Sequence, residues 1–479
     1  MGSGVQWESI PRMVLSAADR FGDAEAVVAG PLRLTFAGLA DRVRTAAGAF
    51  ASAGVGPGDR AAVWAPNSAE WMIAAFGLLA AGGVLVPVNT RYTADEAGDI
   101  LRRSGAKLVL VQKGFLGREY TAPPGVPAID IMSGFLDDGS PLERRVDGGA
   151  VAEIMFTSGT SGRPKGVPMT HAQNLRLWSD WCDVADLREG DRYLVVNPFF
   201  HMFGYKAGCL ASMIRGATVL PVPVFDAAAV LDLVERERVT FLPGPPTLYQ
   251  ELLAAAPGRD LSTLRVAVTG SADIPVGLIR RVAAELPFTR IMTGYGLTEA
   301  GTVTASRAGD SFEDVATAVG TPCEGMEVRI AADGEVLVRG FGVMRGYLDD
   351  PAATAEAVDP DGWLHTGDLG TLDGGGRLRI VGRKKDMFIV GGFNAYPAEI
   401  EDRLLEHPAV ARAAVIGVPD ERLGQVGKAF VVPAGPVTAA ELIAWSRERM
   451  AGFKAPRHIE FLDELPMNET GKIMKDRLR

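Results

Sequence analysis

Short apolar runs alternate with helical patterns in the first part of the chain. The runs at residues 61–64, 84–88 and 107–111 include β-branched residues, and helical spacing of apolar residues separates them. Parallel strands need a helical crossover between them, so this rhythm predicts βαβ units and a parallel sheet. Residues 113–149 are rich in Gly, Pro and Asp without a clear period, which predicts an irregular connection.

The alternation resumes after residue 150 and changes character near residue 320. A strand is expected at 152–156, and alternating helices and strands are expected through 215–222, 227–242 and 264–268. The strands of a β-rich lobe are expected at 326–330, 335–339 and 377–380. A small α+β unit follows from about Asp386, with a helix at 397–406 and strands at 410–417 and 429–432. The predicted fold class is α/β, with two parallel-sheet subdomains and the β-rich lobe preceding the small α+β domain.

One apolar run, residues 71–88, is long enough to suggest a transmembrane helix. Gly82 and Gly83 divide it into a helix-like half and a β-branched half that ends at Pro87. We therefore predict a helix followed by a buried strand, and no membrane span. Trp7 and Glu8 stand where a secretory signal would be basic and apolar, so no such signal is expected.

Composition narrows the class of protein. A chain of 479 residues allows roughly three domains of about 150 residues. It carries 49 basic and 59 acidic residues, and this net charge of −10 argues against binding to a nucleic-acid backbone. The three cysteines are odd in number and far apart, which fits neither a disulfide framework nor a zinc site and favours the cytoplasm.

A loop rich in hydroxyls and glycine is the strongest local signal. It comprises Thr157, Ser158, Gly159, Thr160, Ser161, Gly162, Arg163, Pro164, Lys165 and Gly166. Glycines let backbone N–H groups approach an anion closely, and Arg163 and Lys165 add positive charge. Pro164 stands where a Walker loop needs glycine. Because strands are expected on both sides, we interpret the loop as a phosphate clamp, the alternative being a flexible surface turn.

Further motifs follow this loop along the chain. They are Asn197-Pro198-Phe199-Phe200-His201, Gly294-Tyr295-Gly296-Leu297-Thr298-Glu299, His365-Thr366-Gly367-Asp368, Gly382-Arg383-Lys384-Lys385-Asp386 and Gly471-Lys472. Together they resemble the adenylate-forming superfamily of acyl-CoA synthetases, luciferases and adenylation domains, over essentially the whole chain. Segments 197–206 and 242–246 are most similar to actinobacterial acyl-CoA synthetases that act on propionates derived from steroid rings.

The resemblance implies an ATP-dependent acid–thiol ligase. Such enzymes join a carboxylic acid to ATP, release pyrophosphate, and pass the acyl group of the acyl-adenylate to CoA. The site must neutralise charge and hold carboxylate and phosphorus in line. ATP, Mg²⁺ and CoA are thus the implied cofactors and co-substrates, and the protein is expected to be a monomer or homodimer.

The resemblance also assigns the nucleotide site. Glu299 is expected to hold Mg²⁺ and Thr298 to bond the α-phosphate, whereas a lone glutamate is ordinarily a solvated charge. Asp368 is expected to accept ribose hydroxyls and Arg383 to contact ribose or phosphate, the alternatives being a turn-forming residue and a surface ion pair. Adenine is expected between Tyr295 and the small residues Gly270, Ser271 and Ala272, the alternative for Tyr295 being a core aromatic. Gly296, next to Tyr295, is expected at the same nucleotide site.

Four further elements are assigned in the same way. Lys472 matches the lysine that bridges the attacking carboxylate and the α-phosphate, and otherwise would be a mobile surface charge. His201 matches a gating aromatic position, the alternative being packing. Lys385 matches the hinge about which the C-terminal domain rotates between the half-reactions. The thiol tunnel is expected along Gly391, Gly392 and Phe393, where the alternative is a strand turn needing positive φ.

The acyl pocket is predicted from proximity to these motifs. Its candidates are Phe200, Tyr205, Lys206, Tyr249 and Thr269. Lys206 has two interpretations: its ammonium hydrogen-bonds a polar group of the acid, or it has an Asp or Glu partner in the fold or reaches solvent. On the first interpretation the substrate is a compact, ring-bearing or oxygenated acid.

The domain boundary and the alternatives follow from the resemblance. Residues 1–384 are expected to bind ATP and acid, and residues 385–479 to form the mobile domain with the catalytic lysine. An alternative keeps adenylation and changes the acceptor to a carrier-protein thiol, an amine or nitrite. A nucleotide-binding relative without catalysis is disfavoured by Lys472, Glu299 and Asp368.

Overall fold

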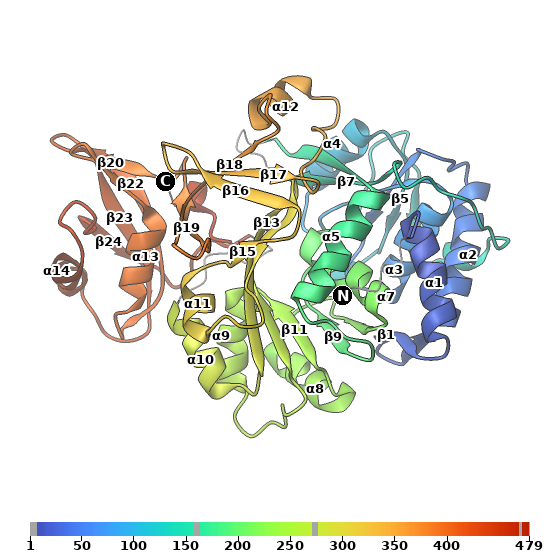
Figure 1. The fold of residues 1–479 in the computed structure, drawn as a ribbon, viewed down its shortest axis with the longest axis horizontal. Coiled ribbons are helices and arrows are strands. Elements are labelled where there is room, and N and C mark those ends of the chain that lie inside the picture. The colour runs from blue at the N-terminus through green and yellow to red at the C-terminus, as the bar shows by residue number, and fades with distance from the viewer. Residues whose placement is uncertain (1–6, 158–162, 271–275, 469–471, 479) are drawn as a thin grey trace.

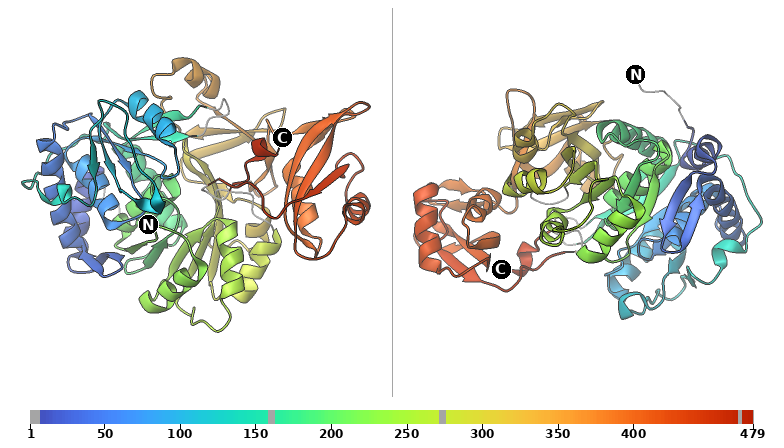
Figure 2. Two further views of the ribbon diagram at one scale, coloured as in Figure 1. Left: turned by 180° about the vertical axis from the view of Figure 1, so that it is seen from behind. Right: turned by 90° about the horizontal axis from the view of Figure 1, so that it is seen from below.

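The computed structural model describes residues 7–157, 163–270, 276–468 and 472–478. Two large sheets with helices between and around them form the body of the molecule, and a smaller sheet with its own helices stands at one end (Figure 1). A four-stranded sheet lies between that small domain and the body in each of the views (Figure 2). The predicted α/β fold is confirmed.

The first sheet has six strands in the order β6-β5-β3-β4-β7-β8, parallel except for the β7–β8 hairpin. Its strands are β3 (Arg60–Trp64), β4 (Val84–Pro87), β5 (Ala106–Val111), β6 (Ala128–Asp130), β7 (Val151–Thr157) and β8 (Lys165–Thr170). Strand β6 falls in the segment predicted to be irregular. It has three residues and is defined by its pairing with β5, which no local pattern reveals.

The second sheet has nine strands in the order β15-β14-β13-β12-β11-β9-β10-β1-β2. They are β1 (Glu25–Ala29), β2 (Leu32–Thr35), β9 (Arg192–Val195), β10 (Thr218–Pro221), β11 (Phe241–Gly244), β12 (Val266–Thr269), β13 (Arg290–Leu297), β14 (Gly301–Ala305) and β15 (Thr321–Pro322). The sequence pattern predicted parallel βαβ units from residue 7 to about residue 111, and this was wrong for β1 and β2, which form an antiparallel hairpin. Strand β1 also pairs with β10 of the second sheet, through Val27 and Val219.

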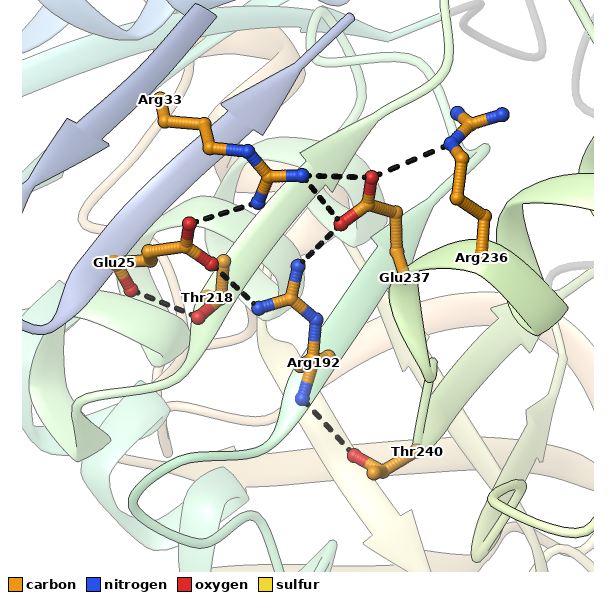
Figure 3. A network of polar contacts seen from close by, with 7 residues as sticks. All are labelled: Glu25, Arg33, Arg192, Thr218, Arg236, Glu237 and Thr240. Carbon is orange, nitrogen blue, oxygen red and sulfur yellow. Dashed lines mark hydrogen bonds and ion pairs between the residues drawn. The ribbon is translucent and has the colours of Figure 1, made fainter.

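An ion-pair network holds this hairpin at the edge of the second sheet (Figure 3). Arg33 of β2 donates to both carboxylate oxygens of Glu237 at 3.0 Å, and Arg192 of β9 donates to Glu237 at 2.8 Å and to Glu25 at 2.7 Å. Thr218 donates to the backbone carbonyl of Glu25 at 2.8 Å. Glu237 is only 6% exposed, so it needs the two guanidinium groups to remain charged there.

The helices form three layers around these two sheets. A large apolar core fills the space between the sheets, and separate cores lie on their outer faces. In β3, Ala61 and Val63 face the central core while Ala62 and Trp64 face the outer one, as the two-residue period of a strand requires. The helices of the central layer are α1 (Ile10–Phe21), α2 (Phe36–Ser52), α3 (Ala69–Ala80), α5 (His171–Val184), α6 (Met202–Gly204) and α7 (Ala211–Arg215). Those on the outer faces are α4 (Ala94–Ser104), α8 (Ala227–Glu237), α9 (Pro246–Ala255), α10 (Val276–Glu285) and α11 (Phe312–Thr317).

Helix α3 explains the long apolar run of the sequence. Every one of its residues except Glu70 is buried, because the helix lies in the central core with neighbours on all sides. The predicted helix and the buried strand β4 after it are confirmed. Within the described ranges, none of the helices combines the length and the apolar content that crossing a bilayer requires.

The β-rich lobe and the C-terminal unit complete the chain. The lobe is an antiparallel sheet of β16 (Met326–Ile330), β17 (Glu335–Gly340), β18 (Leu364–Leu372) and β19 (Leu378–Arg383), with α12 (Pro351–Ala357) beside it. The C-terminal sheet contains β20 (Phe388–Val390), β21 (Phe393–Ala395), β22 (Val410–Asp420), β23 (Gly424–Pro433) and β24 (His458–Phe461). Helices α13 (Pro397–Leu405) and α14 (Ala439–Arg449) contribute to its core, which begins at Phe388 and is separate from those of the body.

Candidate active site

Three residues predicted to bind the nucleoside meet at the junction of the body and the β-rich lobe. Tyr295 of β13 donates its hydroxyl hydrogen to Asp368 Oδ2 at 2.6 Å. Arg383 of β19 is the register partner of Asp368 on β18, and its Nε lies 3.1 Å from Asp368 Oδ1. Burial, and then the charge of Asp368, raise the pKa of Tyr295 well above its usual value, so the phenol stays a hydrogen-bond donor.

A buried carboxylate that sequence reasoning missed supports this group. Glu335 of β17 accepts the backbone N–H of Gly367 at 2.9 Å and lies 3.2 Å from Lys384 Nζ and 3.3 Å from His365 Nδ1. The Lys384 backbone N–H also donates to the Gly367 carbonyl at 2.9 Å. Glu335 thereby fixes both the turn before Asp368 and the residue before the predicted hinge. A single glutamate in a strand carries no sequence signal for such a role.

The phosphate loop and Glu299 also come together. Thr157, at the end of β7, donates to Glu299 Oε1 at 3.4 Å, and the Tyr347 hydroxyl donates to the same oxygen at 3.1 Å. Lys165 Nζ lies 4.8 Å from the centre of the Tyr347 ring. Burial and the Glu299 charge raise the pKa of Tyr347. Tyr347 was not predicted, because it lies outside every motif and reaches the site only through the fold.

Arg163 does not add to the positive charge of the loop as expected. Its guanidinium donates to Asp99 of α4 at 2.6 Å, and this ion pair holds it on the outer side of the first sheet. Arg103 of the same helix donates to the Pro164 carbonyl at 2.6 Å, so α4 anchors the end of the loop. Other predicted residues of the nucleotide site lie outside the described residues, namely Ser158, Gly159, Thr160, Ser161, Gly162, Ser271 and Ala272.

The glycine-rich segments at this site place backbones in close contact. A Cβ on Gly296 would lie 2.5 Å from the Gly301 carbonyl oxygen of β14, so only glycine fits there. Gly270, at the end of β12, is buried next to Gly294. Thr298 lies in the turn between β13 and β14, half-buried and adjacent to Glu299. These residues bring the predicted adenine and phosphate contacts to the same end of neighbouring strands.

The oxygen ligands around Glu299 suit a small divalent cation. The described part of the chain holds no cluster of three or more His, Cys, Asp or Glu side chains able to bind a metal by themselves. Mg²⁺ is commonly held by one or two carboxylates together with substrate phosphates. Glu299, with the Thr157 hydroxyl 3.4 Å away, fits that pattern of ligation.

The positive charges of two lysines act on His201. It precedes α6, and its Nδ1 accepts the Phe203 backbone N–H at 3.2 Å, which requires an unprotonated Nδ1. Burial, followed by the positive charges of Lys472 and Lys206, lowers the pKa of His201 to about 4. The imidazole is therefore neutral near pH 7. The structure thus brings Lys472, from the C-terminal domain, within electrostatic reach of a residue in the body.

Lys472 lies on one of two paired arms, residues 466–468 and 472–474, which together we call the Lys472 hairpin. Met467 and Ile473 form an antiparallel bridge, and the Met474 N–H donates to the Pro466 carbonyl at 2.8 Å. The Lys472 N–H donates to Asn468 Oδ1 at 2.8 Å, and the Asn468 N–H donates to the Lys472 carbonyl at 2.7 Å. This pairing fixes the backbone of the second arm, on which Lys472 is exposed.

Lys206 has the carboxylate partner that one of its two interpretations required. It lies in a π-helical segment, η3 (Tyr205–Leu210), and its Nζ is 2.6 Å from Glu153 Oε1 of β7. Lys206 is 2% exposed and Glu153 is fully buried. Asn174 of α5 donates to both Glu153 oxygens, at 2.9 and 3.0 Å. Because Lys206 and Glu153 compensate each other's charge in a buried place, we withdraw Lys206 as a ligand of the acid.

Two tyrosines predicted for the acyl pocket have their rings in apolar cores. The Tyr249 hydroxyl donates to the carbonyls of Leu242 and Val268, and its ring packs in the outer core of the second sheet. The Tyr205 ring lies 5.3 Å from the Trp71 ring in the central core. Tyr249 is therefore wrong as a pocket residue, because proximity in sequence to a motif does not fix the direction of a side chain. The buried Tyr205 hydroxyl has no hydrogen-bond partner among the described residues, so Tyr205 stays a candidate.

Phe200 and Thr269 remain as candidates. Phe200 is half-buried in the turn next to His201. Thr269 ends β12 and is 1% exposed, and its Oγ1 has no hydrogen-bond partner among the described residues. An unpaired buried hydroxyl is costly, so it is suited to a polar atom supplied by a ligand or water.

The hinge and tunnel residues lie at the start of the C-terminal domain. Lys385 is exposed in the turn after β19, next to Lys384. Gly391 and Gly392 have φ values of 56° and 90° and turn the chain between β20 and β21, as the simpler interpretation of these glycines requires. Phe393 is 60% exposed and stacks on Phe453 with ring centres 5.1 Å apart.

Known proteins resemble this chain over nearly all of its length. The family model described as AMP-binding enzyme matches residues 15–348, and the one described as AMP-binding enzyme C-terminal domain matches residues 399–472. A 3-[(3aS,4S,7aS)-7a-methyl-1,5-dioxo-octahydro-1H-inden-4-yl]propanoyl:CoA ligase of Rhodococcus jostii (strain RHA1) is 47% identical over 503 residues, covering 98% of both chains. A protein of the same name from Mycobacterium tuberculosis (strain ATCC 25618 / H37Rv) is 47% identical with the same coverage.

Solved structures share the arrangement of both parts of the chain. o-Succinylbenzoate CoA synthetase from Bacillus subtilis, in complex with its acyl-adenylate intermediate, superimposes with a TM-score of 0.89 at 30% identity, over 98% of this chain and 97% of that one. An anthranilate CoA ligase in complex with anthranoyl-AMP gives a TM-score of 0.91 at 26% identity, over 100% and 98%.

Proposed function

Because the chain belongs to the family of AMP-binding enzymes and is an AMP-forming acyl-CoA ligase, we propose that its substrate is a compact bicyclic keto acid with a propionate side chain. The observation that carries this proposal is the 47% identity, over 98% of both chains, to two ligases named for a methyl-dioxo-octahydroindenyl propanoyl group. The names of these relatives favour CoA over a carrier-protein thiol, an amine or nitrite as the acceptor.

Activation begins when a carboxylate oxygen of the acid attacks the α-phosphorus of ATP and pyrophosphate leaves. Asp368, with Tyr295 and Arg383 beside it, holds the ribose and places that phosphorus. Thr157 and Lys165 bind phosphate oxygens near Glu299. Mg²⁺ held at Glu299 would supply further positive charge to those oxygens.

Lys472 and His201 have different parts in this step. The Lys472 ammonium bridges the attacking carboxylate and the α-phosphate, where two negative groups must approach each other. His201 is neutral, because its pKa is about 4, and therefore adds no charge to the carboxylate. It acts as a shaped wall beside the acid, with its ring fixed by the hydrogen bond from the Phe203 N–H.

Thiol transfer follows a rotation of residues 385–479 about Lys385. The CoA sulfur attacks the acyl carbonyl carbon, and AMP leaves. Two features support a pivot at this point: Lys384 is tied to Asp333 and Glu335 of the lobe at 2.7 and 3.2 Å, and the C-terminal domain has its own core from Phe388 onward. Gly391, Gly392 and Phe393 then line the path of the thiol.

The cellular compartment and the oligomeric state are a further part of the proposal. We place it in the cytoplasm as a monomer or homodimer, and its three cysteines, all buried and free, support a reducing compartment. Burial raises the pKa of the Cys182 thiol to about 12 and that of Cys323 to about 11, so neither is a thiolate at neutral pH.

A pyrophosphate-release screen of free carboxylic acids tests the substrate. The bicyclic dioxo propanoate is compared with ferulate and with a straight-chain acid of equal carbon number, each with and without CoA, and products are identified by mass spectrometry. We expect a kcat/KM for the bicyclic acid at least about 10²-fold above that of the straight-chain acid, because a site built for polar groups rejects analogues that lack them. Equal kcat/KM values for all three acids would overturn the proposal.

A further inference from the structure

Among the described residues, one bridge and backbone hydrogen bonds join the two arms of the Lys472 hairpin, and a two-stranded hairpin is at best marginally stable alone in water. Contacts at its base therefore contribute to its position. Ile473 packs on the second core of the C-terminal sheet, beside Ile416 and Phe430, and fixes one side of that base.

A buried ion pair fixes the base at a second point. Lys475 Nζ lies 2.7 Å from Glu401 Oε1, and the same oxygen accepts the Val415 backbone N–H at 2.6 Å. Glu401 belongs to α13 and Val415 to β22, so the carboxylate lies where helix and sheet meet. Lys475 opens the short 3₁₀ segment η4 (Lys475–Arg477), three residues after Lys472.

This pair differs from the other ion pairs described for the C-terminal domain. The side chains of Lys475 and Glu401 are 15% and 7% exposed, whereas those of Lys428 and Glu460 are 29% and 49% exposed. Exposed pairs contribute little, while a buried carboxylate needs its partner and holds it in a defined place. The Lys475 ion pair thus attaches the chain that follows Lys472 to Glu401, a buried residue of the C-terminal domain.

We propose that the Glu401–Lys475 ion pair positions the Lys472 hairpin for acyl-adenylate formation and is not needed for thiol transfer. Both residues act through Lys472 and touch no reacting atom, so they are positioning residues. The inference rests on the proposed function, in which Lys472 works in the first half-reaction. A displacement of about 1 Å at a reacting group can cost about 10²-fold in rate, so a loosened base is enough to impair adenylation.

The test separates positioning from stability. Lys475→Met breaks the pair but leaves a buried charge on Glu401, whereas the double variant Glu401→Gln/Lys475→Met breaks it without that charge. Lys475→Arg retains a cation, and Lys428→Met removes an exposed ion pair of the same domain as a matched control. For each full-length enzyme we measure single-turnover adenylation, the KM for ATP, thiol transfer from supplied acyl-adenylate, and Tm.

We expect both Lys475→Met proteins to adenylate at least about tenfold more slowly, with the KM for ATP and thiol transfer within about twofold of the wild type. The double variant should regain the Tm lost by Lys475→Met without regaining adenylation. Lys475→Arg and Lys428→Met should resemble the wild type. A double variant that adenylates normally, or loses both half-reactions equally, overturns the inference.

Assays of the wild type and of Lys472→Ala distinguish a failure of this inference from a failure of the proposed function. If the wild type releases no pyrophosphate with any acid tested, the proposed function itself is overturned. If Lys472→Ala adenylates as fast as the wild type, the proposed role of Lys472 is refuted, and so is the positioning role of Glu401 and Lys475.

Discussion

Two lysines lower the pKa of His201, and the structure holds them in different ways. Lys206 is 2% exposed and is held by the buried Glu153, which also accepts two hydrogen bonds from Asn174. Lys472 is exposed on a hairpin of another domain, and it contributes more than Lys206 to the lowered pKa of His201. The difference teaches that a buried, paired lysine serves the fold, whereas an exposed lysine on another domain stays accessible for the role proposed for Lys472.

The sharpest way to test this contrast is to remove the Lys472 charge. Lys472→Ala should slow adenylation by about 10²–10³-fold, because its ammonium is needed where carboxylate and α-phosphate meet. Thiol transfer from supplied acyl-adenylate should remain within about threefold, since in the proposed mechanism the domain rotation withdraws the lysine before this step. Single-turnover assays of each half-reaction measure both rates. Equal losses in the two would contradict this division of labour.

A second test restricts the backbone at the proposed hinge between the body and the C-terminal domain. Lys385→Pro holds φ near −65°, so a pivot at this residue could not change that dihedral angle. We expect a burst of about one pyrophosphate per enzyme, followed by CoA-thioester turnover at least about tenfold below the wild type. Rapid-quench kinetics measure the burst, and Lys385→Ala, which keeps a free φ, is the control. Steady turnover by the proline variant would show that the pivot lies elsewhere.

The structural side of the contrast is tested through Lys206. Lys206→Met leaves Glu153 charged, buried and without its cation, which should lower the free energy of unfolding by about 3–5 kcal/mol. Glu153→Gln/Lys206→Met removes both charges and should lie within about 1 kcal/mol of the wild type. Urea denaturation measures both variants. A stable Lys206→Met protein whose KM rises for oxygenated acids alone would restore Lys206 to the acyl pocket.

The smallest effect concerns the pKa of His201. Its pKa is about 4 in the folded protein, below the ordinary 6.5, so folding favours the neutral ring. The corresponding stability is present above about pH 6.5 and is lost as the pH falls toward 4, because the unfolded chain then binds the extra proton. Lys472→Ala should raise this pKa part of the way toward 6.5, since burial, the leading cause, remains. NMR titration of the imidazole measures it, and an unchanged pKa would mean that Lys472 is remote from His201 in solution.

Much of the candidate site follows from sequence because its residues sit in local motifs. Tyr295, Asp368 and Arg383 were each predicted, and the fold joins them within 2.6 and 3.1 Å. Glu335 and Tyr347 could not be predicted in the same way. Each reaches the site from a strand or turn without a distinctive pattern. The partners of Glu335 come together when the strands of the lobe pair, and Tyr347 meets Glu299 only in the folded chain.

The sequence by itself determined the elements whose periodicity is local. The buried helix α3, the strands β3 and β5 and the helix α13 appear where apolar spacing places them, because one turn or one pleat fixes which residues face a core. Only the tertiary structure decided which sheet the β1–β2 hairpin joins, that Lys206 meets Glu153, and that Arg163 turns to Asp99. Such pairings join residues far apart in the chain, and burial and charge select them only after the elements have packed.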